Sequence, residues 1–171
     1  MSQQLIPSAQ VTDLSEAERA EIDAEIAHAP YRSAVAIDAL KIIQSHRRWV
    51  SDDALAALAD YLEMSAAELD GIATFYNLIF RRPVGENVIL VCNSVSCWIK
   101  GCDNIREAIS AELGIGLGET TADDRFTLLP VTCLGACDRA PVMMVGDNKF
   151  EDVSTERISA ILEHGEGATP G

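Results

Sequence analysis

The sequence predicts an α/β protein in two parts, a helical first half and a mixed second half. Two observations lead to this fold class. Up to about residue 80, apolar residues recur at steps of three and four, as on one face of a helix. Beyond "RRPVGE" (81–86), short continuous apolar runs replace that pattern, as expected for buried strands. The 171 residues, 48% of them apolar, suffice for one ordinary domain or a small domain with a helical extension.

Four helices are predicted in the first half. "SEAE" (15–18) and "SAAE" (65–68) are capping boxes, in which a serine caps the helix and a glutamate three residues later reaches back to it. Two further helices begin near Ser33 and at Ser51, the second with acidic residues in its first turn, where the helix dipole favours them. This pattern indicates an N-terminal helical bundle.

The second half alternates between strand and helix patterns. In order, we expect a strand at 87–92, a helix at 102–114, strands at 126–133 and 141–146, a short return strand at 148–152 and a helix at 154–163. The tripeptide "GDN" (146–148) is typical of a hairpin turn. The order β-α-β-β-β-α describes a thioredoxin-like α/β sandwich, with the first two strands parallel.

Pro83 and Gly85 mark the connection between the two parts. We therefore predict four segments. They are a flexible N-terminus at 1–13, the helical bundle at 14–84, the α/β domain at 85–164 and a disordered tail at 165–171.

The charge balance excludes some partners. The net charge is −14, with 13 basic residues against 27 acidic ones. A nucleic-acid binder needs lysine and arginine to neutralise phosphates, so nucleic acid is not expected as a partner. The longest apolar runs are too short to span a bilayer, and the N-terminus does not read as a targeting segment. We expect an intracellular protein without direct membrane insertion, in which clustered cysteines indicate metal or redox chemistry.

Four of the five cysteines form two pairs that follow predicted strands. Cys92 and Cys97 make C-x4-C, and Cys133 and Cys137 make C-x3-C. If the two strands are parallel, both loops leave the sheet at one edge and the four thiolates converge there. Cys102 lies in the first turn of the next predicted helix and has no such partner. It is predicted not to be a ligand.

Thiolates are soft ligands that select zinc, copper(I) or iron–sulfur clusters. The two loops are wide for a zinc site and suit a two-iron cluster in which each pair holds one iron. The sequence has neither the spacing of plant-type ferredoxins nor the C-x2-C motif of thiol–disulfide enzymes. We favour an iron–sulfur cluster. A zinc-stabilised interaction module without a redox role, and buried cysteines without any metal, stay open as alternatives.

In combination, these motifs resemble the NuoE family of bacterial NADH–quinone oxidoreductase, the respiratory complex I. The resemblance runs from about residue 14 to 163. It rests on "ALKIIQSHRRWVSDDALAALADYL", "GIATFYNLIF", "VCNSVSCWIKG" and "RFTLLPVTCLGACDRAPVMMV". Trp98 stands where the family often has histidine, and we expect it to pack in the core or at an interface.

The resemblance implies one 2Fe–2S cluster on a thioredoxin-like ferredoxin domain, held by Cys92, Cys97, Cys133 and Cys137. It also implies an electron-transfer role beside the FMN- and NADH-binding subunit, and contact with the iron–sulfur-rich subunit of the same peripheral arm. The expected location is cytoplasmic, peripheral to the inner membrane. Without a G-x-G-x-x-G loop, this chain alone is not expected to oxidise NADH, and no catalytic residue is assigned to it.

The cysteine motifs leave the parent complex open. Relatives of this family also serve NAD-dependent formate dehydrogenase and NAD-reducing hydrogenase, next to the same kind of flavin module. The length of the helical half and its overall match favour the respiratory complex.

Overall fold

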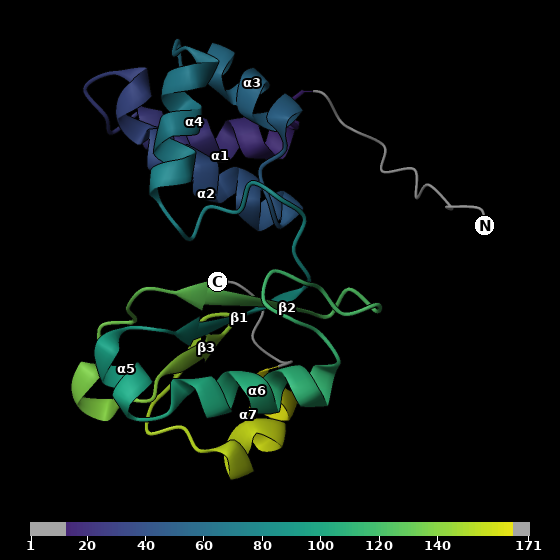
Figure 1. The fold of residues 1–171 in the computed structure, drawn as a ribbon. Helices are drawn as coiled ribbons and strands as arrows, with labels where there is room; N and C mark the ends of the chain where they lie inside the picture. The colour runs from purple at the N-terminus through teal and green to yellow at the C-terminus, as the bar shows by residue number, and fades with distance from the viewer. Residues whose placement is uncertain (1–12, 166–171) are drawn as a thin grey trace. The chain divides into compact units, whose positions relative to one another are not determined.

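The computed structural model describes residues 13–165, which divide between Pro83 and Val84 into two compact units (Figure 1). We refer to them as the helical unit and the α/β unit. The predicted flexible N-terminus (1–13) and disordered tail (165–171) lie outside the described residues, except for Asp13 and Gly165.

The helical unit contains four α-helices and one short 3-10 helix. They are α1 (Glu16–Ile26), η1 (Arg32–Val35), α2 (Ala36–Arg47), α3 (Asp52–Tyr61) and α4 (Ala66–Phe75). Ser15 and Ser65 each accept a hydrogen bond from the N–H of the glutamate three residues on, and each glutamate accepts one from the serine N–H. Both predicted capping boxes are therefore confirmed. Ser51 caps α3 by accepting from the N–H of Ala54.

One apolar core holds these helices together. Its largest fully buried side chains are Ile22, Leu40, Ile43, Leu58, Leu62 and Leu69. They come from every α-helix of the unit, so each helix contributes one apolar face to the same core, as their periodicity predicts. Burial of such side chains contributes about 1.5–3 kcal/mol each, which makes this core the main source of the unit's stability.

A buried ion pair joins α1 to α2. Glu18 is 1% exposed, and its two carboxylate oxygens accept hydrogen bonds of 2.6 Å from Nε and Nη2 of Arg47. Burial alone would raise the pKa of the Glu18 carboxyl, but the hydrogen bonds from Arg47 and Ser15 outweigh it and hold that pKa below its usual value. Glu18 therefore stays ionised inside the unit. The sequence indicated Glu18 only as a capping residue.

The α/β unit is built on a four-stranded sheet with the strand order β2-β1-β3-β4. Its strands are β1 (Asn87–Cys92), β2 (Phe126–Val131), β3 (Met143–Val145) and β4 (Asn148–Phe150). Strands β1 and β2 are parallel, whereas β3 runs antiparallel to both β1 and β4. The β3–β4 hairpin turns at 146–147, where Gly146 takes the positive φ of 55° that such a turn needs.

Helices α6 (Cys102–Leu113) and α7 (Ile158–Gly165) cover one face of this sheet (Figure 1). Their buried isoleucines pack against alternate residues of β1, Ile89 and Val91. Three shorter helices, α5 (Val95–Ile99), η2 (Cys137–Arg139) and η3 (Thr155–Arg157), complete the unit. Helix α5 was not predicted, because five residues are too few to show a helical period.

The predicted mixed α/β architecture is confirmed. Within residues 13–165, no helix combines the length and the apolar character that crossing a membrane requires.

Candidate metal centre

The parallel pairing of β1 and β2 brings the two cysteine loops together. Cys92 pairs with Val131 at the last step of the register, and the N–H of Asn93 donates to the carbonyl of Val131 at 3.0 Å. Both strands therefore end at the same edge of the sheet, as predicted. One detail is corrected: β2 ends at Val131, so Cys133 does not end the strand and lies in the loop that follows it.

The first pair is buried. Cys92, the last residue of β1, and Cys97, in α5, are 2% and 1% exposed. Helix α5 turns Cys97 back toward the strand, so that its thiol interacts with that of Cys92. Burial, followed by the neighbouring Cys92 thiol, raises the pKa of Cys97 to about 11. Cys92 Sγ also lies 3.8 Å from the carbonyl oxygen of Thr132 in the second loop.

The second pair is exposed. The sulfurs of Cys133 and Cys137 lie 3.7 Å apart. Gly135 has φ of 77°, a left-handed conformation that favours glycine, and its N–H donates to Cys133 Sγ at 3.3 Å. This hydrogen bond, followed by one from Cys137, lowers the pKa of Cys133, and the same contact with Cys133 raises the pKa of Cys137.

The two pairs meet in one place. The thiol of Cys92 interacts with that of Cys133, and α5, which carries Cys97, packs against η2, which begins at Cys137. A backbone interaction with Val142 lowers the pKa of Cys97, against the larger effect of burial. Val142 was not predicted to contact the site, because it lies far along the chain and only the sheet topology brings it there. The structure thus brings all four predicted ligand residues together.

Cys102 packs beside this cluster without belonging to either pair. It is 3% exposed and shares an apolar cluster with Cys92 and Cys97. A helix N-terminus can lower a thiol's pKa, but here burial, followed by the charge of Asp103, raises the pKa of Cys102. Cys102 is therefore a neutral buried thiol.

A model of the family described as thioredoxin-like 2Fe-2S ferredoxin matches residues 22–166. The chain belongs to this family. The E subunit of NADH-quinone oxidoreductase from Pseudomonas aeruginosa is 48% identical to this ferredoxin over 150 residues, which cover 88% of this chain and 90% of the relative. The corresponding E subunit from Escherichia coli is 45% identical over 157 residues, covering 92% and 95%.

Among solved structures, an NAD+-reducing NiFe hydrogenase in the air-oxidized state matches 80% of this ferredoxin with a TM-score of 0.66. The match has 24% sequence identity and spans 23% of the longer hydrogenase chain, so it shows a shared fold alone. Together with the family match, it confirms the predicted thioredoxin-like fold, and the family confirms the predicted 2Fe–2S cofactor.

The sulfur separation within the second cysteine pair of this ferredoxin suits two ligands of one metal. Metal–sulfur bonds of about 2.3 Å at a tetrahedral angle separate two sulfurs by about 3.8 Å. Cys133 and Cys137, at 3.7 Å, match that separation for two ligands of one metal. Among the described residues, no group of three or more His, Cys, Asp or Glu side chains is arranged to hold one ion together.

Trp98 departs from the prediction in part. It is 59% exposed, so it does not pack in the core of the α/β unit. The adjacent helical positions leave Val95 and Ile99 exposed as well, while Cys97 faces inward. The predicted core packing of Trp98 is therefore wrong, and its place at an interface stays a prediction.

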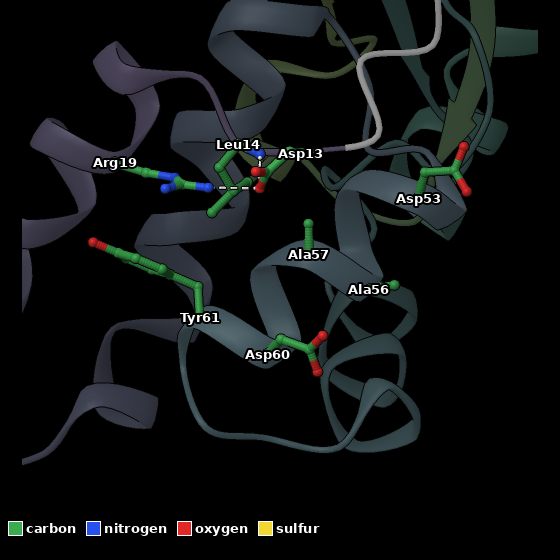
Figure 2. A pocket seen from close by; sticks show the side chains of 8 residues that line it. All are labelled: Asp13, Leu14, Arg19, Asp53, Ala56, Ala57, Asp60 and Tyr61. Carbon is green, nitrogen blue, oxygen red and sulfur yellow. Dashed lines mark hydrogen bonds and ion pairs between the residues drawn. The ribbon is translucent and has the colours of Figure 1, made fainter.

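A hollow of about 540 Å³ lies in the helical unit (Figure 2). In its lining, Arg19 Nη2 donates a hydrogen bond of 2.7 Å to Asp13 Oδ1. Figure 2 draws this pair together with the ring of Tyr61. Its lining residues are Asp13, Leu14, Arg19, Asp53, Ala56, Ala57, Asp60 and Tyr61. None of them is a cysteine or histidine, so the hollow offers no soft ligand for iron.

Proposed function

We propose that this ferredoxin is the electron-transfer subunit that carries one 2Fe–2S cluster in an NADH–quinone oxidoreductase. Relatives named as the E subunit of that enzyme match it at 45–48% identity over nearly their whole length, which supports this assignment. The match to the hydrogenase supports only the fold, since its identity is 24%. An equivalent subunit of an NAD-reducing hydrogenase or a formate dehydrogenase is therefore the weaker assignment.

The observation that carries the proposal is the convergence of two cysteine pairs at the ends of two parallel strands. Cys92 and Cys97 would hold one iron, and Cys133 and Cys137 the other. Ligation requires the thiolate form, and burial of Cys97 opposes that form. Cys97 would therefore have to lose its proton to act as an iron ligand.

When bound, the cluster takes up and releases one electron at a time. The chain's own residues prepare the site for this. Gly135 directs its backbone N–H at Cys133, and a backbone interaction with Val142 lowers the pKa of Cys97; both stabilise negative charge on the sulfurs. Burial of Cys92 and Cys97 keeps water away from the first pair.

The proposed partners are the FMN- and NADH-binding subunit and the iron–sulfur-rich subunit of the same peripheral arm. This chain supplies no nucleotide cradle of the G-x-G-x-x-G type, so NADH oxidation belongs to the partner. The proposed location is cytoplasmic, peripheral to the inner membrane as part of the complex. We also propose residues 14–84 as a helical bundle and residues 85–164 as the β-α-β-β-β-α ferredoxin domain.

Iron and sulfide analysis of the purified full-length chain tests this function. We expect a brown protein with iron and acid-labile sulfide in equal amounts, about two of each per chain, and a rhombic EPR signal after reduction with dithionite. A colourless protein that contains zinc and gives no EPR signal would overturn the proposal in favour of a zinc-stabilised interaction module.

The parent complex is tested separately. Purified from its native cells by a tag on this chain, the complex should reduce a quinone with NADH. Co-purification of a hydrogenase or formate dehydrogenase activity, without quinone reduction, would assign the ferredoxin to the alternative complex instead.

A further inference from the structure

The five cysteines differ in how well a dissolved oxidant can reach their sulfurs. Cys92, Cys97 and Cys102 are at most 3% exposed, whereas Cys133 and Cys137 are both exposed. A thiol reacts with a small oxidant only when the two can touch, so susceptibility follows exposure. Of the five cysteines, which all lie within the described residues, the second pair alone meets this condition.

The two exposed sulfurs also lie close to each other. Cys133 Sγ and Cys137 Sγ are 3.7 Å apart. A disulfide bond is about 2.0 Å long, so the two sulfurs must approach each other by about 1.7 Å to form one. Both cysteines belong to the loop that follows β2, so the bond would close a small ring within one loop.

The loop is anchored at its ends and has room to adjust between them. At its start, the N–H of Asn93 holds the carbonyl of Val131 at 3.0 Å, and at its end the N–H of Arg139 holds that of Ala136 at 3.0 Å. Between these anchors lies Gly135, where an added Cβ would meet nothing within 4 Å. The backbone can therefore shift around this glycine and bring the sulfurs together without moving the sheet.

The nearest competing bond would join Cys133 to Cys92, because these two side chains also interact. Cys92 is the last residue of β1, which lies between β2 and β3 in the sheet. Its backbone is therefore held by strands on both sides, and its sulfur is 2% exposed. A bond to Cys92 must distort the sheet edge, whereas a bond between Cys133 and Cys137 distorts only the loop.

We infer that Cys133 and Cys137 form a reversible disulfide when the chain meets a low-molecular-weight disulfide before its cluster is inserted. One thiolate of the pair attacks a sulfur of the oxidant, and one thiolate of the oxidant leaves. The second thiolate of the pair then attacks the resulting mixed disulfide and releases the other half of the oxidant. The two cysteine sulfurs lose one electron each, the oxidant gains both, and the two thiol protons pass to the released thiolates.

This bond acts on the same site that the proposed function uses. Iron binds the thiolate form of cysteine, so a disulfide between Cys133 and Cys137 removes two of the four candidate ligands. Reduction of the bond restores them. The effect on cluster insertion rests on the proposed 2Fe–2S function, whereas formation of the disulfide does not. The exposed pair thus makes insertion depend on the thiol redox state around the chain.

The test uses the full-length chain from which a chelator has removed the metal under reducing conditions. Glutathione disulfide is the oxidant, and the products are identified by the mass of their tryptic peptides. Trypsin leaves both cysteines of the second pair on one peptide, 126–139. The expected product is this peptide with two hydrogens fewer, whereas a bond from Cys133 to Cys92 would join two peptides.

Two variants separate the role of the pair from general thiol reactivity. Cys102→Ala removes a buried thiol and should give the same product as the wild type. Cys137→Ser removes the second thiol of the pair, so glutathione should stay bound to Cys133 as a mixed disulfide. If circular dichroism shows that Cys137→Ser is unfolded, Cys133→Ser replaces it, and glutathione should then stay on Cys137.

Iron uptake measures the consequence for the site. A scaffold protein loaded with a 2Fe–2S cluster, without added thiol or sulfide, is the iron source. The oxidised wild-type chain should take up iron about tenfold less than the reduced chain, because half of its ligands are blocked, and dithiothreitol should restore the uptake.

Contrary outcomes separate the inference from the proposed function. A Cys92–Cys133 bond, or a wild-type chain that keeps glutathione, would overturn the assigned disulfide. Equal iron uptake by the oxidised and reduced chains would overturn its effect on the site. A reduced wild-type chain that takes up no iron would contradict the proposed function, while the tryptic peptide would still decide whether the disulfide forms.

Discussion

The helical unit and the α/β unit both bury groups that prefer water, but they stabilise them differently. In the helical unit, the carboxylate of Glu18 is buried against the guanidinium of Arg47, and the two charges satisfy each other within the chain. In the α/β unit, the buried Cys97 thiol has a pKa of about 11, because its neighbours are other thiols and apolar side chains. The first arrangement is complete without a ligand. The second becomes favourable for thiolates only when a metal supplies the positive charge.

The largest expected effect follows from removing a sulfur. Cys97→Ala or Cys133→Ala leaves one iron with a single protein ligand, so we expect loss of most of the iron and of the visible absorbance. The α1–α4 core contains no cysteine, so the helical unit should keep its stability. Iron analysis and urea unfolding of the same samples measure both effects. Full iron content in either variant would contradict the ligand assignment.

Breaking the ion pair between Glu18 and Arg47 should instead destabilise the helical unit and leave the iron content unchanged. Glu18→Gln leaves the half-buried guanidinium of Arg47 without its carboxylate, and removal of one partner of a buried pair costs about 3–5 kcal/mol. We expect the lower end, about 3 kcal/mol, because the Arg47 side chain is 21% exposed. The control is Glu16→Gln, at an exposed position in the same first turn of α1, which should change stability by less than about 0.5 kcal/mol.

Urea unfolding followed by the fluorescence of Trp49 measures this effect in a Trp98→Phe background, where Trp49 is the single tryptophan and reports on the helical unit. The iron content should stay unchanged. Equal stability of the Glu18→Gln and Glu16→Gln chains would show that the ion pair contributes nothing to the unit.

The buried carboxylate of Glu18 should also make the stability of the helical unit depend on pH. The pKa of Glu18 is lowered in the folded chain, so its contribution to stability is present above the unfolded value near 4.5 and is lost as the pH falls through the folded value. Between pH 5 and pH 3, the helical unit should therefore lose stability more steeply in the wild type than in Glu18→Gln. Parallel curves for the two chains, from Trp49 fluorescence across that range, would refute this linkage.

A smaller effect is expected at Gly135. Alanine meets no atom within 4 Å there, but it must adopt a φ of 77°, which costs about 1–2 kcal/mol. The loop is expected to relax, and the N–H bond to Cys133 to lengthen. We predict that Gly135→Ala retains iron and shifts the reduction potential to more negative values, since a donor that stabilises negative charge is weakened. Potentiometric titration monitored by EPR measures the shift; Gly114→Ala, also at positive φ but in the cap of α6, is the control.

The smallest effect is expected at Cys102. Cys102→Ala removes one buried sulfur that belongs to neither pair, so iron content, spectrum and EPR signal should match those of the wild type. Stability of the α/β unit should fall by about 1 kcal/mol, as for a small cavity. Loss of iron from this variant would show that the fifth cysteine is a ligand and that one of the two pairs is misassigned.

Much of the site follows from local patterns. The spacing of Cys92, Cys97, Cys133 and Cys137 after two apolar strands predicted their convergence, because parallel strands end at one edge of a sheet. The capping serines predicted where α1 and α4 begin. The caps and the spacing within each cysteine pair depend on residues near one another in the chain, and the convergence of the pairs follows from the general geometry of parallel strands.

The sequence by itself thus determined the helical periods, the caps, the cysteine pairs and the family resemblance. Only the tertiary structure decided that the first pair is buried and the second exposed, that Val142 interacts with Cys97, and that Glu18 meets Arg47. Burial and electrostatic pairing depend on what other segments of the chain place nearby. A residue's type fixes its chemistry, but the dielectric and the partners that tune that chemistry are set by segments far away in the sequence.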